Sequence, residues 1–100
     1  MVKVSEIFII TEGNLLEGIM RIDKFLKNSR LIKRRTIAKE ACDTGKVTLN
    51  DRPAKAGSEV KVGDIIKLEF GRGTLVVRVL VISESSKKDD ALRMYEIIEG

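Results

Sequence analysis

The chain has 100 residues, of which 43% are hydrophobic and 34% are charged, and this size and composition fit a single folded domain. It contains no histidine and a single cysteine, so the commonest general base, the commonest zinc ligand and any cysteine pair are missing. No apolar run is long enough for a membrane span or a signal peptide. We therefore expect a cytoplasmic protein that is not an enzyme and binds no cofactor, metal or membrane.

The net charge of +4 is unevenly distributed along the chain. Residues 1–19 and 84–100 each carry −2, whereas residues 20–83 carry +8. Within this part, residues 21–35 hold seven basic side chains and one acid, Asp23. Such a concentration of charge repels itself and favours a polyanionic partner, because phosphates neutralised by Lys and Arg release their counterions. A solvated, lysine-rich helix face is the alternative interpretation.

Two short amphipathic helices are expected first. In residues 21–29 the buried positions repeat at i, i+3, i+4 and i+7. They are Ile22, Phe25, Leu26 and Ser29. Residues 31–32 form a tight apolar link. The second helix covers residues 34–44 and ends before Gly45, which tolerates the left-handed conformation at a helix C-terminus. Its buried stripe is expected to be Ile37, Ala38, Ala41 and Cys42. Cys42 is thus a core residue rather than a reactive thiol.

The start of the second helix breaks a local rule. Lys33, Arg34 and Arg35 crowd an N-terminus, where the helix dipole prefers negative charge. Breaks of this kind often mark functional sites. A bound phosphate would resolve the conflict by using both the cationic side chains and the free backbone N–H groups. Alternatively, the long side chains extend into water at small cost.

From residue 46 the hydrophobic period changes to two, which indicates strands. Residues 46–50 form a strand that ends in a turn at 50–53, and residues 55–62 are expected to be irregular. A strand over 65–70 is expected to place Ile66, Leu68 and Phe70 on one face, and the hairpin connection Gly71-Arg72-Gly73 follows it. The longest strand covers 74–82, and its apolar residues on both faces predict that both faces are covered. Phe70, like Phe25, is assigned to the core.

The sequence allows two interpretations of the secondary structure near the C-terminus. Residues 87–93 are expected to form a short helix, with Ser86 as a possible N-cap. Residues 94–98 either continue this helix or form a terminal strand. The fold class is therefore α+β, with two N-terminal helices packed on a small mixed or antiparallel sheet. We divide the chain into an N-terminal segment (1–19), a domain (20–82) and a short C-terminal extension (83–100).

Residues 20–80 resemble the S-four type RNA-binding domain, also called the alpha-L motif. The resemblance rests on Arg-Ile-Asp-Lys-Phe-Leu at 21–26, the basic helix start, Gly-Lys-Val at 45–47 and Val-Lys-Val-Gly-Asp at 60–64. The stretches 20–27 and 29–36, Lys-Lys-Asp-Asp-Ala at 87–91 and the Met-Tyr pair at 94–95 are similar to the narrower RqcP family.

The RqcP family consists of stand-alone factors of bacterial ribosome-associated quality control. The resemblance implies a monomer that binds large ribosomal subunits carrying peptidyl-tRNA, contacts ribosomal RNA and tRNA, and supports alanine tailing by a partner factor. Alternatives are a heat-shock-type ribosome-recycling protein, a general structured-RNA-binding module or a protein adaptor. A targeting arm of an RNA-modifying enzyme would need a catalytic domain, for which the chain has no room.

The candidate RNA-binding residues are Arg21, Lys24, Lys27, Arg30, Lys33, Arg34, Arg35 and Lys39. By the resemblance, Arg21 and Arg35 fall on the positions most expected to touch RNA. Because only four residues are aromatic, recognition of RNA shape and backbone is favoured over base stacking.

The acidic residues 1–19 have no counterpart in the family pattern. One hypothesis is that Met20 is the native start. The alternative is an ordinary N-terminal extension, in which residues 7–10 could add an edge strand.

Overall fold

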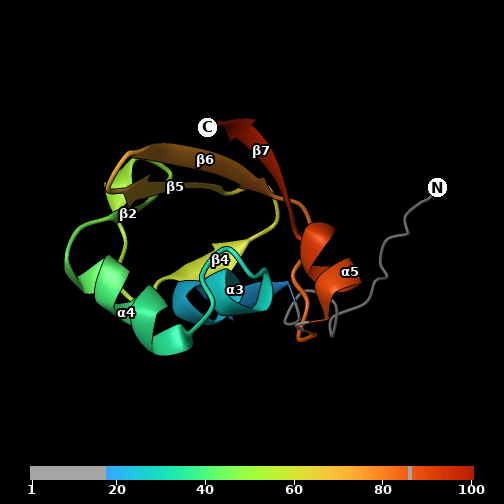
Figure 1. Cartoon of the computed structure of the whole chain (residues 1–100). Coiled ribbons are helices and arrows are strands. Elements are labelled where there is room, and N and C mark those ends of the chain that lie inside the picture. Colours follow the sequence, from blue (N-terminus) through green and yellow to red (C-terminus); the bar gives the residue numbers. More distant parts are fainter. Residues whose placement is uncertain (1–17, 86) are drawn as a thin grey trace.

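The computed structural model describes residues 18–85 and 87–100 (Figure 1). Three predictions lie outside these residues: the native-start hypothesis, the edge strand at 7–10 and the Ser86 N-cap. In the described part, two helices lie beneath an antiparallel sheet: α3 (Ile22–Asn28) and α4 (Arg35–Asp43). The expected α+β class, with a basic helix pair packed on a small sheet, is confirmed. No helix among these residues has the length and hydropathy to cross a membrane.

The main sheet has five strands in the order β3-β2-β5-β6-β7, and all neighbours are antiparallel. Its strands are β2 (Val47–Leu49), β3 (Arg52–Pro53), β5 (Ile65–Phe70), β6 (Gly73–Val79) and β7 (Tyr95–Glu99). Phe70 pairs with Gly73 across a two-residue turn, which confirms the predicted hairpin. The sheet therefore combines two hairpins, β2–β3 and β5–β6, with the longer-range pairings of β2 with β5 and of β6 with β7.

A second, two-stranded sheet was not predicted. In it β1 (Ile19–Arg21) pairs with β4 (Glu59–Lys61). Residues 55–62, expected to be irregular, thus include a strand. Just beyond this pairing, the backbone N–H of Ile22 donates to the Ser58 carbonyl at 2.7 Å. The small sheet therefore fixes where α3 begins.

The core lies between the helices and the inner face of the main sheet. Ile22, Phe25 and Leu26 are completely buried and Ser29 is nearly so, which confirms the predicted face of the first helix. Strands β5 and β6 contribute four alternating side chains to the same cluster, and β2 contributes a fifth: Ile66, Leu68, Val77, Val79 and Val47. Burying such side chains stabilises the fold by about 1.5–3 kcal/mol each, so this cluster sets the position of α3.

The second helix is less fully covered than its pattern predicted. Ala38 and Cys42 are buried, as expected, but Ala41 is only partly buried and Ile37 is 49% exposed. The prediction for Ile37 is therefore wrong. Ile37 lines an open groove beside α4 instead of packing into the core. Gly45 ends the helix with φ +80°, as expected.

The outer face of the main sheet is open, which contradicts the predicted cover on both faces. Val76 is only partly buried there, and exposed Arg78 forms an ion pair with Glu96 of β7 at 2.8 Å. Strand β6 also ends at Val79, short of the predicted residue 82. The chain leaves the sheet after Val79: Leu80 and Val81 are exposed, and Ile82 packs against the core.

The C-terminal residues return to the fold. Helix α5 (Lys88–Leu92) has Lys87 at its N-cap, and residues 95–99 form β7, so the strand alternative holds at the end of the chain. Met94 is completely buried, and its carbonyl accepts the backbone N–H of Leu80 at 2.8 Å. The connecting segment crosses α3, where Asn28 Nδ2 donates to the Ser83 carbonyl at 3.1 Å.

Candidate nucleic-acid interface

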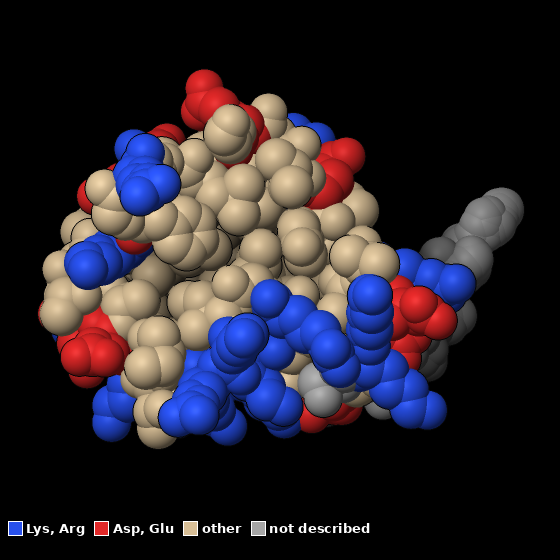
Figure 2. Space-filling model, in the orientation of Figure 1, with Lys and Arg blue, Asp and Glu red and all other residues tan. Residues whose placement is uncertain are grey.

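Basic side chains gather over the helix pair. Figure 2 shows them along the lower edge of the molecule, over α3 and α4, whereas blue and red mix around the sheet. Six of the predicted residues are exposed: Arg21, Arg30, Lys33, Arg34, Arg35 and Lys39. Lys24 and Lys27 are partly buried. The fold thus brings the predicted set onto one pair of helices and their link.

The link between the helices is tight. Arg30 has φ 64°, a left-handed conformation that is uncommon for a residue with a side chain. Its N–H donates to the Lys27 carbonyl at 3.0 Å, and the N–H of Ile32 donates to Leu26 at 3.0 Å. Leu31 and Ile32 pack against the core, as expected for an apolar link. The backbone around Arg30 and Lys33 is therefore held in one shape.

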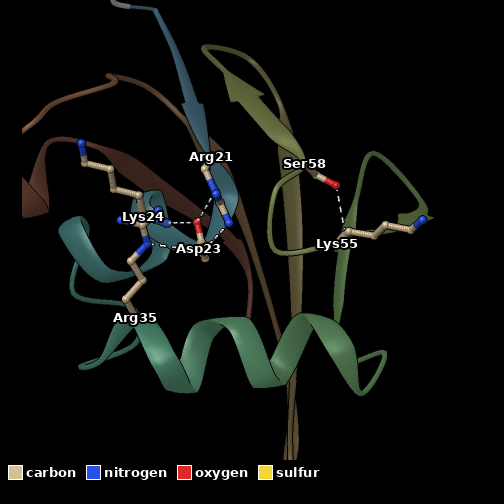
Figure 3. A network of polar contacts seen from close by, with 6 residues as sticks. All are labelled: Arg21, Asp23, Lys24, Arg35, Lys55 and Ser58. Atoms are coloured by element: carbon tan, nitrogen blue, oxygen red, sulfur yellow. Dashed lines mark hydrogen bonds and ion pairs between the residues drawn. The ribbon is translucent and has the colours of Figure 1, made fainter.

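The buried carboxylate of Asp23 organises the surface (Figure 3). It accepts the backbone N–H of Lys24 at 2.7 Å. Arg21 donates to it through Nε at 3.2 Å and Nη2 at 3.1 Å, and Arg35 Nε lies 3.4 Å away. Two predicted RNA-binding residues from different elements therefore meet at one carboxylate. No sequence pattern marked Asp23 as the shared partner of these two arginines.

Lys24 is directed to another partner. Its ammonium group forms an ion pair with Glu84 of the segment that crosses α3. In Figure 3 its side chain extends away from the Asp23 carboxylate. Lys24 is thus partly neutralised within the chain, which makes it less available to an outside anion.

The backbone N–H groups at the start of α4 have no side-chain cap. Arg34 is the N-cap, no side chain caps the first N–H groups, and the first turn contains no acid. These backbone donors therefore face water or an outside partner. This geometry is compatible with the predicted phosphate contact, which stays a prediction.

The single cysteine is chemically quiet. Burial, followed by the negative charges of Asp23 and Asp43, raises the pKa of the Cys42 thiol from 9.0 to about 11. The protonated thiol is a poor nucleophile and metal ligand. Cys42 is thus a small core residue, as expected.

An apolar groove opens between α4 and the hairpin end of β5. It holds about 400 Å³, and Phe70 on its wall is 51% exposed, so the assignment of Phe70 to the core is wrong. Its apolar lining is Leu31, Ile32, Ile37, Ala41, Val47, Leu68 and Phe70. Strand alternation placed Phe70 on the inner face correctly, but α4 does not extend far enough to cover it.

Comparisons with known proteins show the family to which the chain belongs. The sequence pattern of the S4 domain family matches residues 20–66, the part that contains the basic helix pair. A protein of Streptococcus pneumoniae (strain ATCC BAA-255 / R6), named RQC P-site tRNA stabilizing factor, is 51% identical over 79 residues. The match covers 79% of this chain and 90% of that protein. This chain belongs to the family of RQC P-site tRNA stabilizing factors.

Two solved structures have a similar fold. The solution structure of the hypothetical protein HP1423 superposes with a TM-score of 0.70 at 37% identity, covering 81% of this chain and 99% of that one. The trimeric structure of Vibrio cholerae Heat Shock Protein 15 has a TM-score of 0.74 at 29% identity, covering 79% and 81%. The RQC factor thus shares its fold with the heat-shock protein, but its sequence is more similar to the stabilizing factors.

Proposed function

We propose that this RQC factor is a non-catalytic RNA-binding protein that contacts peptidyl-tRNA in the P site and the ribosomal RNA of the large subunit. The name of its relatives supports the tRNA contact. The observation that carries the proposal is the row of exposed cations along α3, the link and α4. Lys33, Arg34 and Lys39 in this row have no carboxylate partner among residues 18–85 and 87–100.

Binding to RNA would follow from charge and rigidity. Lys and Arg side chains bind phosphates and release counterions, which favours association at low salt. The helix pair changes shape little, because its inner face is part of the core. A rigid, charged surface recognises the backbone of folded RNA rather than its base sequence.

Several accompanying expectations belong to this proposal. The factor acts in the cytoplasm, where ribosomes are, and works as a monomer beside the tailing factor that adds alanine to stalled chains. A trimeric assembly is known from the solved structure of Vibrio cholerae Heat Shock Protein 15. A ribosome-recycling role like that of the heat-shock protein is the second candidate, because the two share a fold.

The test uses purified large subunits with and without peptidyl-tRNA, over a salt series. The variant Lys33→Ala/Arg34→Ala removes two exposed cations of the row. The control Lys67→Ala/Arg72→Ala removes the same charge from β5 and its hairpin, since both residues are exposed there. We expect the first variant alone to weaken binding, with a salt slope smaller by roughly 1.4–1.8, if each cation contacts one phosphate.

The outcomes separate the candidates. Tight binding that needs peptidyl-tRNA supports the quality-control role. Equal binding to subunits without peptidyl-tRNA would favour a general ribosome-binding module or the recycling role. If both variants lose the same affinity, or neither loses any, the interface does not lie on Lys33 and Arg34.

A further inference from the structure

A carboxylate in the middle of a phosphate-binding surface is unexpected, because it repels the ligand. Asp23 is 3% exposed, yet it lies between two of the arginines that carry the surface charge. A buried carboxylate without cationic partners is strongly destabilising. Its position therefore needs an explanation beyond the general fold.

The contacts of Asp23 leave many arginine donors unused. A guanidinium carries five N–H donors in a fixed plane. Arg21 gives Asp23 the Nε donor and one donor of Nη2, so three remain. Arg35 approaches Asp23 only through Nε, so its four Nη donors remain. Both side chains are about half exposed, so these donors are accessible to an outside anion.

We propose that Asp23 is the positioning residue of the RNA surface: it joins Arg21 and Arg35 into one preorganised pair that grips an RNA phosphate. The inference rests on the proposed function and adds how the surface is built. Arg21 precedes α3 and Arg35 begins α4, so the carboxylate also locks the two elements together at the surface. Two planar donors held in place lose less freedom on binding phosphate than two free side chains.

The neighbouring turn leaves this arginine pair open. The turn at 55–58 is fastened beside α3, because the N–H of Asp23 donates to the Ala56 carbonyl at 3.3 Å. At Gly57, an added Cβ would lie 4.0 Å from Arg21 Nη2. Gly57 is not among the positive-φ glycines, so its backbone does not require glycine. A larger side chain at 57 would instead cover part of the guanidinium.

The first test is Asp23→Asn, which keeps the shape but removes the negative charge. If charge alone mattered, this variant would bind RNA more tightly. We expect the opposite: affinity for large subunits carrying peptidyl-tRNA falls about tenfold, equal to about 1.4 kcal/mol. The salt slope should also fall by about one phosphate contact. Simple destabilisation would reduce the active fraction without changing that slope.

A second variant tests the same arginine pair in case Asp23→Asn does not fold. Gly57→Val leaves the Asp23 contacts in place and is expected to weaken the same binding by shielding Arg21, with an unchanged melting temperature. Lys61→Val serves as its control, because Lys61 is an exposed residue of the neighbouring strand β4 whose side chain makes no contact with Asp23.

The results separate the inference from the function on which it rests. Asp23→Asn binding as tightly as the wild type, or more tightly, overturns the positioning role. Should Asp23→Asn fail to fold, unchanged binding by Gly57→Val overturns it. Wild-type affinity in all these variants together with Lys33→Ala/Arg34→Ala would instead reject the proposed RNA surface as a whole.

Discussion

The stability of this protein should fall steeply in mild alkali because of Cys42. Its pKa is raised from 9.0 to about 11 in the folded chain. Between these values the unfolded chain loses the thiol proton and the folded chain keeps it. The raised pKa therefore contributes stability below pH 9 that is lost as pH rises towards 11. Two pH units correspond to about 2.7 kcal/mol at about 1.36 kcal/mol per unit.

The measurement is urea unfolding at pH steps from 8 to 11, for the wild type and Cys42→Ala. Alanine removes the titrating thiol and leaves every other residue unchanged, so the difference between the two proteins isolates the contribution of Cys42. We expect the wild type to lose roughly 2–3 kcal/mol more than the variant over this range. Parallel curves would refute the argument, since they would mean that the Cys42 thiol titrates alike in both states.

Phe25 and Phe70 were both predicted to be core residues, but their replacement should change the free energy of unfolding by different amounts. Phe25→Ala is expected to cost about 3–5 kcal/mol in chemical denaturation, because Phe25 is completely buried. Phe70→Ala should cost less than about 1 kcal/mol, and a larger loss would mean that the groove is closed in solution. A double-mutant cycle on Arg78 and Glu96 should give a coupling of about 0.2–1 kcal/mol that weakens with added salt. A coupling insensitive to salt would contradict that exposed ion pair.

Periodicity predicted the parts of the fold that have enough residues to show a period. The face of α3 and the β5–β6 hairpin follow from repeated spacing, and both agree with the structure. Strands β1 and β4 have three residues each and pair across about forty positions, so no local pattern reveals them. Alternation assigned Phe70 to a face but could not show how far α4 covers that face.

The sequence predicted which residues form the candidate site better than it predicted the contacts between them. The charge count placed the basic residues on the first two helices, and the structure does bring them onto those helices. The charge count could not show that Asp23 is buried or that Arg21 and Arg35 share its carboxylate, because these contacts depend on how the two helices cross. The only local signal was one acid within a basic run.

The return of the chain end to the sheet has a consequence for modularity. The S4 pattern stops at residue 66, inside β5. However, β5 pairs with β6, and the core includes Val77, Val79 and Met94, which lie beyond the pattern. A fragment that ends at residue 66 would contain a truncated β5 without its partner β6. Its unpaired, apolar edge would promote aggregation. Anyone grafting this RNA-binding unit onto another protein should therefore carry the chain through residue 99.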